Sequence, residues 1–403
     1  MFSFWNKDVR ITLVVAVVVI CTVVGIRRFV FRPEGADAHV KVGFIFDGDE
    51  STPYSYGFYL ARNELEKEFG GTVETLVRSN VPYSIVEEVI DSLVVEGCEL
   101  IFTNSYGYGE SAKKMAQKYP YVQFCQATCD NANAEPFCEN YHTFMGEIYQ
   151  GRFVAGIVAG MKLRELIDSG VISAEEAKVG YVGAYPYAEV ISGYTAFLLG
   201  IRSIAPEARM FVRYTNTWNS FSLEKACARR LLDEGCVIIS QHSDTIGPAV
   251  ACEEMYPTRP VYHVGYNQSM IDVAPLTSLI STRINWIPYI MGAARAVLQK
   301  KDIEKVVRGH VHGNDIGAGF ESDWVQMLEL NAIIAAPGTQ EMIYVIIEEL
   351  KKGAIEVFFG DYTGVNPYDA NDTCDLSTEY YENAAASAPS FHYVLNDVVT
   401  VED

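Results

Sequence analysis

Short apolar runs alternate with amphipathic stretches along the chain from about residue 40 to residue 270. Runs that are nearly continuous in apolar, β-branched residues are typical of strands buried on both faces of a parallel sheet. The stretches between them, such as "SFSLEKACARRLLDEG", have helical spacing, and several end in the glycine that often follows a helix. The alternation therefore predicts an α/β protein with parallel sheets. The predicted strands span residues 40–46, 73–79, 99–105, 122–128, 178–184, 209–215, 237–243 and 260–266.

These strands are more than one compact sheet needs, and a second series begins near residue 178, so we expect two lobes. A long helix over 149–170 connects the two series, and its glycine and alanine residues permit close packing. Further along we predict a strand-like segment over 306–314, a helix over about 337–353 and a last strand over 355–364. The expected lobe 1 comprises residues 36–150 with a return segment at about 275–325, lobe 2 comprises 151–274 with a later segment at about 326–365, and residues 366–403 form a partly irregular tail.

The first 35 residues differ from the rest, because an uninterrupted apolar run from Ile11 to Gly25 lies between basic residues. We interpret residues 1–35 as an uncleaved transmembrane signal anchor that leaves everything after Pro33 outside the cytoplasm. A cleaved or lipidated export signal is the alternative. A lipid on Cys21 is poorly matched, however, since the residue before it is isoleucine rather than a small residue.

Charge and cysteine content exclude some classes of function. The formal charge of −21 argues against a nucleic-acid partner, because most of the surface would repel phosphates. There are nine cysteines but no C-x-x-C motif and no clean His/Cys ligand spacing, so we expect no metal site and no cofactor. We expect most cysteines to be small buried hydrophobes. An oxidising exterior would permit pairs such as Cys129 with Cys138 or Cys227 with Cys236.

Aromatic and polar residues gather where the predicted strands end, which is where open α/β sheets bind ligands. Rings beside amides, hydroxyls and carboxylates predict a site for a flat small molecule with polar edges. Tyr54 and Tyr56 enter the first helix, where a ring either points across a cleft or packs on the helix start. For Glu189 we expect capping of the next helix rather than binding. The candidate residues after the strands are Asp47, Ser105, Tyr106, Trp218, Gln241, His242, Asp244, Tyr266 and Asn267.

The stretch "QHSD", residues 241–244, gathers Ser, His and Asp as a hydrolase would. Neighbouring residues of a strand point to opposite faces, so Ser243 should point away from both His242 and Asp244. The chain has no G-x-S-x-G elbow to supply an activated serine. A metal site of His242, Asp244 and His263 has no supporting spacing either. We therefore expect His242 and Asp244 to hold a ligand's polar edge, with no catalytic residue.

The chain resembles the basic-membrane-protein family (BMP/Med, PnrA-like) of ABC-transporter substrate-binding proteins from about residue 40 to about residue 360. The segments that carry the resemblance include "LIFTNSYGY", "YQGRFVAGIVAG", "KVGYVGAYPYAEVISGYTAFLLGIRSIAPEA", "YTNTWNSFSLEKACARRLLDEGCVIISQHSDT", "VGYNQS" and "INWIPY". The resemblance implies the two-lobed type I periplasmic-binding-protein fold, with two Rossmann-like parallel-sheet lobes joined by a hinge. It also implies a purine nucleobase or nucleoside as the ligand.

By position, the resemblance implies that Tyr54, with Tyr56 as its neighbour, stacks on one face of the base and Trp218 on the other. Asn267 stands where purine-nucleoside receptors have an aspartate for the sugar, so a free purine is expected as readily as a nucleoside. Trp286, within "INWIPY", joins the expected ligand-binding residues.

The expected function is that of a receptor rather than an enzyme: an anchored, extracytoplasmic monomer that closes on its ligand and presents it to an ABC permease. Two alternatives stay open. One is a ligand-sensing ectodomain of the same fold, and the other is a nucleoside-cleaving hydrolase that uses His242 and Asp244.

Overall fold

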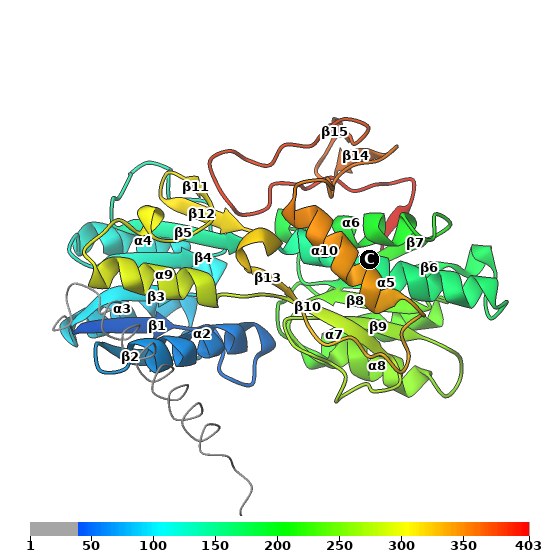
Figure 1. Cartoon of the computed structure of the whole chain (residues 1–403), viewed down its shortest axis with the longest axis horizontal. Helices are drawn as coiled ribbons and strands as arrows, with labels where there is room; N and C mark the ends of the chain where they lie inside the picture. Colours follow the sequence, from blue (N-terminus) through cyan, green and yellow to red (C-terminus); the bar gives the residue numbers. More distant parts are fainter. Residues whose placement is uncertain (1–38, 403) are drawn as a thin grey trace, which may run out of the picture.

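The computed structural model describes residues 39–402, which form two α/β lobes lying side by side (Figure 1). The N-terminal part of the chain, blue to cyan in Figure 1, builds most of lobe 1, and the green part builds most of lobe 2. The expected signal anchor over 1–35, including Cys21, lies outside the described residues. Within residues 39–402, no helix is both long enough and apolar enough to cross a membrane.

Lobe 1 is organised around a sheet of seven strands, called sheet A here. Its strands are β1 (Val40–Ile45), β2 (Val73–Arg78), β3 (Cys98–Thr103), β4 (Gln123–Ala127), β5 (Tyr141–Gly146), β11 (His310–His312) and β12 (Asp315–Ala318). They lie in the order β11-β12-β5-β4-β3-β1-β2, and only the β11–β12 pair is antiparallel. The parallel strands end at the same edge, the edge that faces lobe 2.

Helices cover both faces of sheet A because its central strands are apolar on both sides. They are α2 (Pro53–Phe69), α3 (Val86–Val95), α4 (Gly109–Lys118) and α9 (Ile287–Leu298). Successive residues of β1 show the alternation: Phe44 belongs to the core cluster of Phe58 in α2 and Tyr289 in α9, whereas Ile45 belongs to the cluster of Ile90 in α3.

Lobe 2 repeats this plan around a second seven-stranded sheet, called sheet B. Its strands are β6 (Lys178–Gly183), β7 (Arg209–Tyr214), β8 (Ile238–His242), β9 (Tyr262–Tyr266), β10 (Ser278–Ile284), β13 (Val325–Met327) and β16 (Val399–Glu402), in the order β13-β10-β9-β8-β6-β7-β16. Only the β10–β13 pair is antiparallel. Its helices are α5 (Ile148–Asp168), α6 (Ala188–Arg202), α7 (Phe221–Asp233), α8 (Gly247–Met255) and α10 (Thr339–Lys351).

Smaller elements complete the fold. The strands β14 (Thr363–Asn366) and β15 (Asp369–Asp375) form a separate hairpin. Short 3-10 helices span Tyr83–Ile85, Tyr106–Tyr108, Ala174–Glu176, Ile303–Lys305 and Phe320–Ser322.

The helices α5 and α6 of lobe 2 are so close that their backbones are in contact. A Cβ atom on Gly156 would lie 2.1 Å from the carbonyl oxygen of Phe197, and one on Gly200 would lie 2.2 Å from that of Phe153. Atoms do not pack at such separations, so these positions have no room for a side chain. This contact accounts for the small residues noted in the sequence of the connecting helix.

The chain crosses between the lobes at three places that lie against one another, which together form the hinge. These crossings follow β5, follow β10, and connect β12 to β13. Backbone hydrogen bonds tie them together: Glu147 N–H donates to Ala318 O at 2.9 Å, and Asn285 N–H donates to Trp324 O at 2.7 Å. The lobes are therefore joined by a short, internally bonded hinge.

Each of the eight predicted strands is present within a residue or two of its expected bounds. The strands that were not predicted are β5, β10, β12, β13, β15 and β16, the last two of which lie in the tail that was expected to be partly irregular. The expected return segment of 275–325 begins too early, because β10 pairs with β9 in sheet B. The predicted last strand over 355–364 is wrong in most of its length: only its end belongs to β14, and Phe358 instead stacks on Phe391 of the tail at 4.2 Å. The cysteines of the described residues are all unpaired, and most are buried.

Replacing Gly156 with alanine should destabilise the protein, because the new methyl group would meet the backbone of α6. Overpacking of this kind costs about 1–3 kcal/mol, which should appear as a loss of unfolding free energy in chemical denaturation. Gly57→Ala in α2 is the matched control, since its Cβ would lie 3.1 Å from a side-chain atom of Trp286. Equal losses for both variants would contradict the close helix contact.

Candidate binding site

A cleft of about 790 Å³, including its open mouth, lies between the lobes at the carboxyl ends of both sets of parallel strands. Seven of its lining side chains are aromatic and three are carboxylates. Its lining residues are Asp47, Tyr54, Tyr83, Ser105, Tyr106, Gly107, Thr128, Tyr185, Tyr187, Glu189, Trp218, Asp244 and Tyr266.

The wall from lobe 1 is fixed by a hydrogen-bond network around Asn104, at the end of β3. The Asn104 side chain accepts from Asp47 N–H at 3.0 Å and donates to Asp47 Oδ1 at 3.2 Å. The hydroxyl of Ser55 donates to the same oxygen at 3.2 Å, and the Tyr54 hydroxyl donates to Asn104 O. Two donors thus hold one oxygen of Asp47, and its Oδ2 has no hydrogen-bond partner among residues 39–402.

Tyrosines form the rim of this wall. The Tyr83 hydroxyl is 2.9 Å from Ser105 Oγ, and its ring lies against Gly107, where a Cβ atom would be only 2.8 Å from the ring. Tyr106 is 60% exposed and therefore free to contact a ligand at the mouth. Glycine at 107 is what lets Tyr83 lie flat at this position.

Aromatic residues of lobe 2 face this wall. The rings of Tyr185 and Tyr187 stack on one another at 5.0 Å, and Trp218 lies 5.9 Å from Tyr185. Tyr266, at the end of β9, is buried. Stacked and edge-on rings of this kind present both flat faces and polar tips to a ligand.

Glu189 lies in the first turn of α6, where a carboxylate also interacts favourably with the helix dipole. Its Oε1 is 3.3 Å from Nε2 of His242, whose ring reaches this place by packing on Gly193. Burial lowers the pKa of His242, although Glu189 opposes the shift, so the imidazole is neutral at neutral pH. A neutral His242 that donates from Nε2 therefore orients the Glu189 carboxylate at the cleft.

Asp244 is a buried carboxylate in the part of the lining that lobe 2 provides. It is only 8% exposed, and its Oδ1 accepts a hydrogen bond from Asn267 Nδ2 at 3.0 Å. Burial, followed by the nearby charges of Asp47, Glu224 and Glu189, raises the pKa of Asp244 well above its ordinary value. Its Oδ2 has no hydrogen-bond partner among the residues that the structure describes, so a donor from a ligand would complete the site.

The lining residues include no lysine or arginine. Carboxylates accept hydrogen bonds from N–H and O–H groups, whereas a phosphate or a carboxylate ligand would be repelled. The cleft therefore suits a neutral or cationic ligand that is flat and rich in donors.

Several residues predicted from the sequence line this cleft, and others lie beside or behind it. Those in the lining are Asp47, Tyr54, Ser105, Tyr106, Trp218, Asp244 and Tyr266. His242 and Asn267 lie behind it and hold Glu189 and Asp244. Tyr56 is 41% exposed outside it.

Gln241 and Trp286 serve the core instead. The Gln241 side chain donates to Ser243 O and Thr245 O and lies 3.0 Å from His263 Nε2. Trp286 is buried and stacks on Phe58 at 4.5 Å. Both side chains are directed into lobe interiors rather than at the cleft.

Five lining side chains were not among the predicted site residues: Tyr83, Thr128, Tyr185, Tyr187 and Glu189. For three of them the signal was present, because "YPYAEV" follows β6 as the other candidate loops follow their strands. Tyr83 comes instead from the short 3-10 helix that follows β2, and only the fold brings it next to Ser105.

The arrangement gives no support to a reaction centre. Ser243 is fully buried and donates to Glu224 Oε2 at 2.8 Å, away from His242. Across the described part of the chain, no group of three or more His, Cys, Asp or Glu side chains is placed to hold a metal ion.

Two α/β lobes that enclose a polar, aromatic cleft define a solute-binding protein with the type I periplasmic-binding-protein fold. A sequence profile of the PnrA-like ABC transporter substrate-binding proteins matches residues 39–352, and the chain belongs to this family. The family consists of substrate-binding proteins, not enzymes.

Three comparisons illustrate the relationship. The chain is similar to a purine-binding protein of Brucella abortus, with 32% identity over 265 residues that cover 65% of this chain and 70% of that protein. It is 29% identical over 236 residues, 59% of this chain and 55% of the relative, to a Haloferax volcanii protein provisionally named an ABC transporter glucose-binding protein. A solute-binding protein structure from Aeropyrum pernix K1 matches with a TM-score of 0.62 and 16% identity over 82% of this chain and 95% of that chain, which shows the shared fold.

Replacing Asp244 with asparagine should stabilise the ligand-free protein at neutral pH. Because the pKa of Asp244 is raised in the folded state, ionising it costs folding free energy, and this cost grows as pH rises above the ordinary pKa of about 3.9 towards the folded value. Asparagine keeps an oxygen for Asn267 and does not titrate. We therefore expect a higher Tm than the parent at pH 7.5 and a smaller difference at pH 4, measured by calorimetry.

Asp49→Asn is the control, because the pKa of Asp49 is shifted in the opposite direction to that of Asp244. Hydrogen bonds from Ser51 and Asn80 lower the pKa of this exposed carboxyl group, so its removal should not stabilise the protein at neutral pH. A stabilisation by Asp244→Asn that is the same at pH 4 and pH 7.5 would contradict the assigned cause.

Proposed function

We propose that the protein binds a purine nucleobase or nucleoside in the cleft and is the extracytoplasmic receptor of an ABC importer. The observation that carries this proposal is the pairing of aromatic rings with unpartnered carboxylate oxygens in one cleft. In the proposed complex, Tyr54 of lobe 1 and Trp218 of lobe 2 stack on opposite faces of the base. The similarity to a protein named for purine binding supports the same ligand class.

Hydrogen-bond chemistry supports a base or nucleoside. Purine ring N–H groups, exocyclic amines and ribose hydroxyls are donors that match Asp47, Glu189 and Asp244. Each of these carboxylates is held by a neighbour at one oxygen, so the second oxygen is oriented before the ligand arrives. Purine analogues without those donors would leave buried acceptors unpaired and bind weakly.

The absence of a cation from the lining argues against nucleotides. A phosphate would enter a cleft lined by three carboxylates with no lysine or arginine to offset its charge. We infer that the ligand delivered for transport is a nucleobase or nucleoside without a phosphate group.

The partner in this proposal is a membrane permease that recognises the closed form. Ligand contacts on both lobes would favour closure, because only the closed form makes both sets at once. Anchoring by residues 1–35, and a monomeric receptor, remain parts of this proposal.

Trp218→Ala should weaken binding of the preferred purine or nucleoside by about tenfold or more without unfolding the protein. Stacking of a base on an aromatic ring contributes about 1–3 kcal/mol by alanine substitution, and tenfold is about 1.4 kcal/mol. Isothermal calorimetry with adenine, guanine, adenosine, guanosine and inosine would measure this. Tyr56→Ala, outside the cleft, should leave the affinity unchanged.

The same titrations test the ligand class. Binding of a purine compound with no response to its 5′-monophosphate is the expected result. Binding of glucose alone, or of none of the purines, would overturn the proposal. Release of free base from a nucleoside would instead indicate a hydrolase.

A further inference from the structure

The C-terminal tail is in contact with both lobes. Residues 363–402, called the strap here, follow the part of the chain that matches the family profile, which ends at residue 352. In Figure 1 the orange and red strap runs from the β14–β15 hairpin above lobe 2 towards lobe 1 and returns. It therefore forms a link between the lobes that is separate from the three hinge crossings.

The strap is fastened to lobe 2 at both of its ends. Immediately before its start, Arg202 Nε of α6 donates to the hydroxyl of Tyr362 at 2.8 Å. The Tyr368 hydroxyl lies 3.4 Å from the carbonyl oxygen of Pro186, between two tyrosines of the cleft. At its end, β16 adds a parallel strand to the edge of sheet B beside β7.

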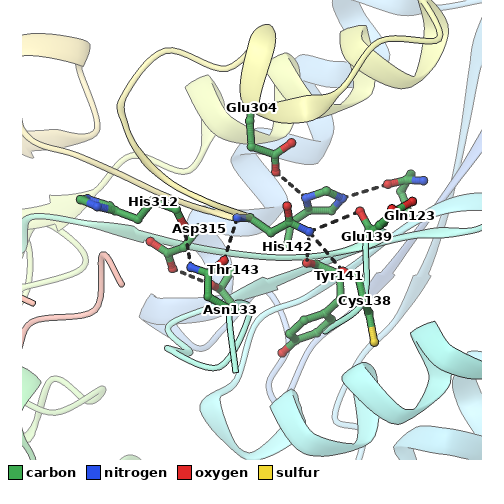
Figure 2. Close-up of polar contacts among 11 residues, drawn as sticks. Gln123, Asn133, Cys138, Glu139, Tyr141, His142, Thr143, Glu304, His312 and Asp315 are labelled. Atoms are coloured by element: carbon green, nitrogen blue, oxygen red, sulfur yellow. Dashed lines mark hydrogen bonds and ion pairs between the residues drawn. The ribbon is translucent and has the colours of Figure 1, made fainter. Parts of the chain in front are cut away.

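Between these ends, residues 383–389 form a finger that rests on lobe 1. The carbonyl oxygen of Ala384 accepts from His312 Nδ1 at 2.8 Å, and that of Ala385 accepts from Asn133 Nδ2 at 2.8 Å. Ser387 N–H donates to Asp315 Oδ1 at 2.6 Å. Figure 2 shows His312, Asn133 and Asp315 near one another, with Thr143 also bonded to Asp315.

The finger fits closely against β12. A Cβ atom on Gly317 would lie 2.5 Å from Cβ of Ser387 and 3.4 Å from the carbonyl oxygen of Met145. The first separation is a clash, whereas the second is close to ordinary contact. Glycine at 317 therefore provides the space that Ser387 occupies.

The base of the finger is closed on itself, so it is more than a loose loop. Glu382 Oε2 accepts from both the N–H and the hydroxyl of Ser390, each at 2.6 Å. Val365 and Val394 exchange backbone hydrogen bonds of 2.9 Å, and the ring of Phe391 stacks on Phe358. These contacts close the base of the finger and join it to the segment that follows α10.

We propose that the strap restrains the angle between the lobes, with its finger acting as a clamp on the β11–β12 edge of lobe 1. Any motion about the hinge that moves this edge away from lobe 2 must break the bonds of the finger or deform its base. The strap thus narrows the range of lobe angles that the ligand-free protein samples. This inference concerns the empty protein and does not depend on the identity of the ligand.

A deletion and a rescue pair test the clamp. In the deletion variant, residues 384–388 are removed and Asn383 is joined to Pro389 through two glycines, which removes the finger and retains the closed base. Gly317→Ala should expel the finger by its clash with Ser387. Adding Ser387→Gly to Gly317→Ala removes the clashing Cβ atom and should let the finger return.

Small-angle X-ray scattering of the ligand-free proteins, with hydrogen exchange of the peptide over 383–390, gives the two readouts. We expect the deletion and Gly317→Ala to widen the distance distribution, and the exchange of Ser387 N–H in Gly317→Ala to be roughly tenfold faster or more. The double variant should return both readouts to those of the parent.

Scattering of the deletion variant that is identical to that of the parent would overturn the proposal. The proposal would also be contradicted if the double variant kept the wide distance distribution of Gly317→Ala. The alanine would then act on β12 directly rather than through the finger. Purine binding that fails in the parent protein would overturn the proposed function and leave this test intact.

Discussion

The buried guanidinium of Arg152 is the contact on which the cleft-facing half of lobe 2 depends. It is fully buried in α5 and donates to Gly265 O at 3.1 Å, to Thr282 Oγ1 at 3.3 Å and to Ser240 Oγ. One side chain thus joins the helix to β8, β9 and β10. Its charge also lies 5.8 Å from the ring of Tyr266, which lines the cleft. A buried cation is costly unless it is hydrogen-bonded, so these partners fix the helix and the strands together.

The cleft beside this support is lined by three carboxyl groups, and a negative charge on one makes ionisation of its neighbours less favourable. Asp244 lies close enough to Asp47 and Glu189 for their charges to raise its pKa, and no cation in the lining offsets them. Burial and these neighbouring charges together oppose the ionisation of Asp244 in the ligand-free protein. Ionisation of Asp244 therefore costs folding stability, and such a cost is common at sites that are organised for function.

The sequence was sufficient to predict the strands that are continuous apolar runs, because a strand buried on both faces of a sheet is apolar along its whole length. It was insufficient for β5, "YHTFMG", and β10, "SLISTRI", whose polar residues have distant partners: His142 lies 2.5 Å from Glu304, and Thr282 bonds Arg152. The rule that ligands bind at strand ends located most of the cleft. It could not distinguish Gln241, which turns into the core, from Asp244 three residues later, because the direction of each side chain depends on partners far along the chain.

The strap adds a constraint from a part of the chain that follows the segment matching the family profile. A hinge alone permits many lobe angles, and closing on a ligand then costs the entropy of selecting one. The bonds of Ala384, Ala385 and Ser387 to lobe 1 limit that freedom before any ligand binds. Whether this strengthens or weakens binding depends on the angle that the strap favours, since apparent affinity scales with the populated fraction of the binding-competent form. The contact of Tyr368 with Pro186 places the same strap beside the cleft's tyrosines, so lobe angle and cleft lining are restrained by one segment.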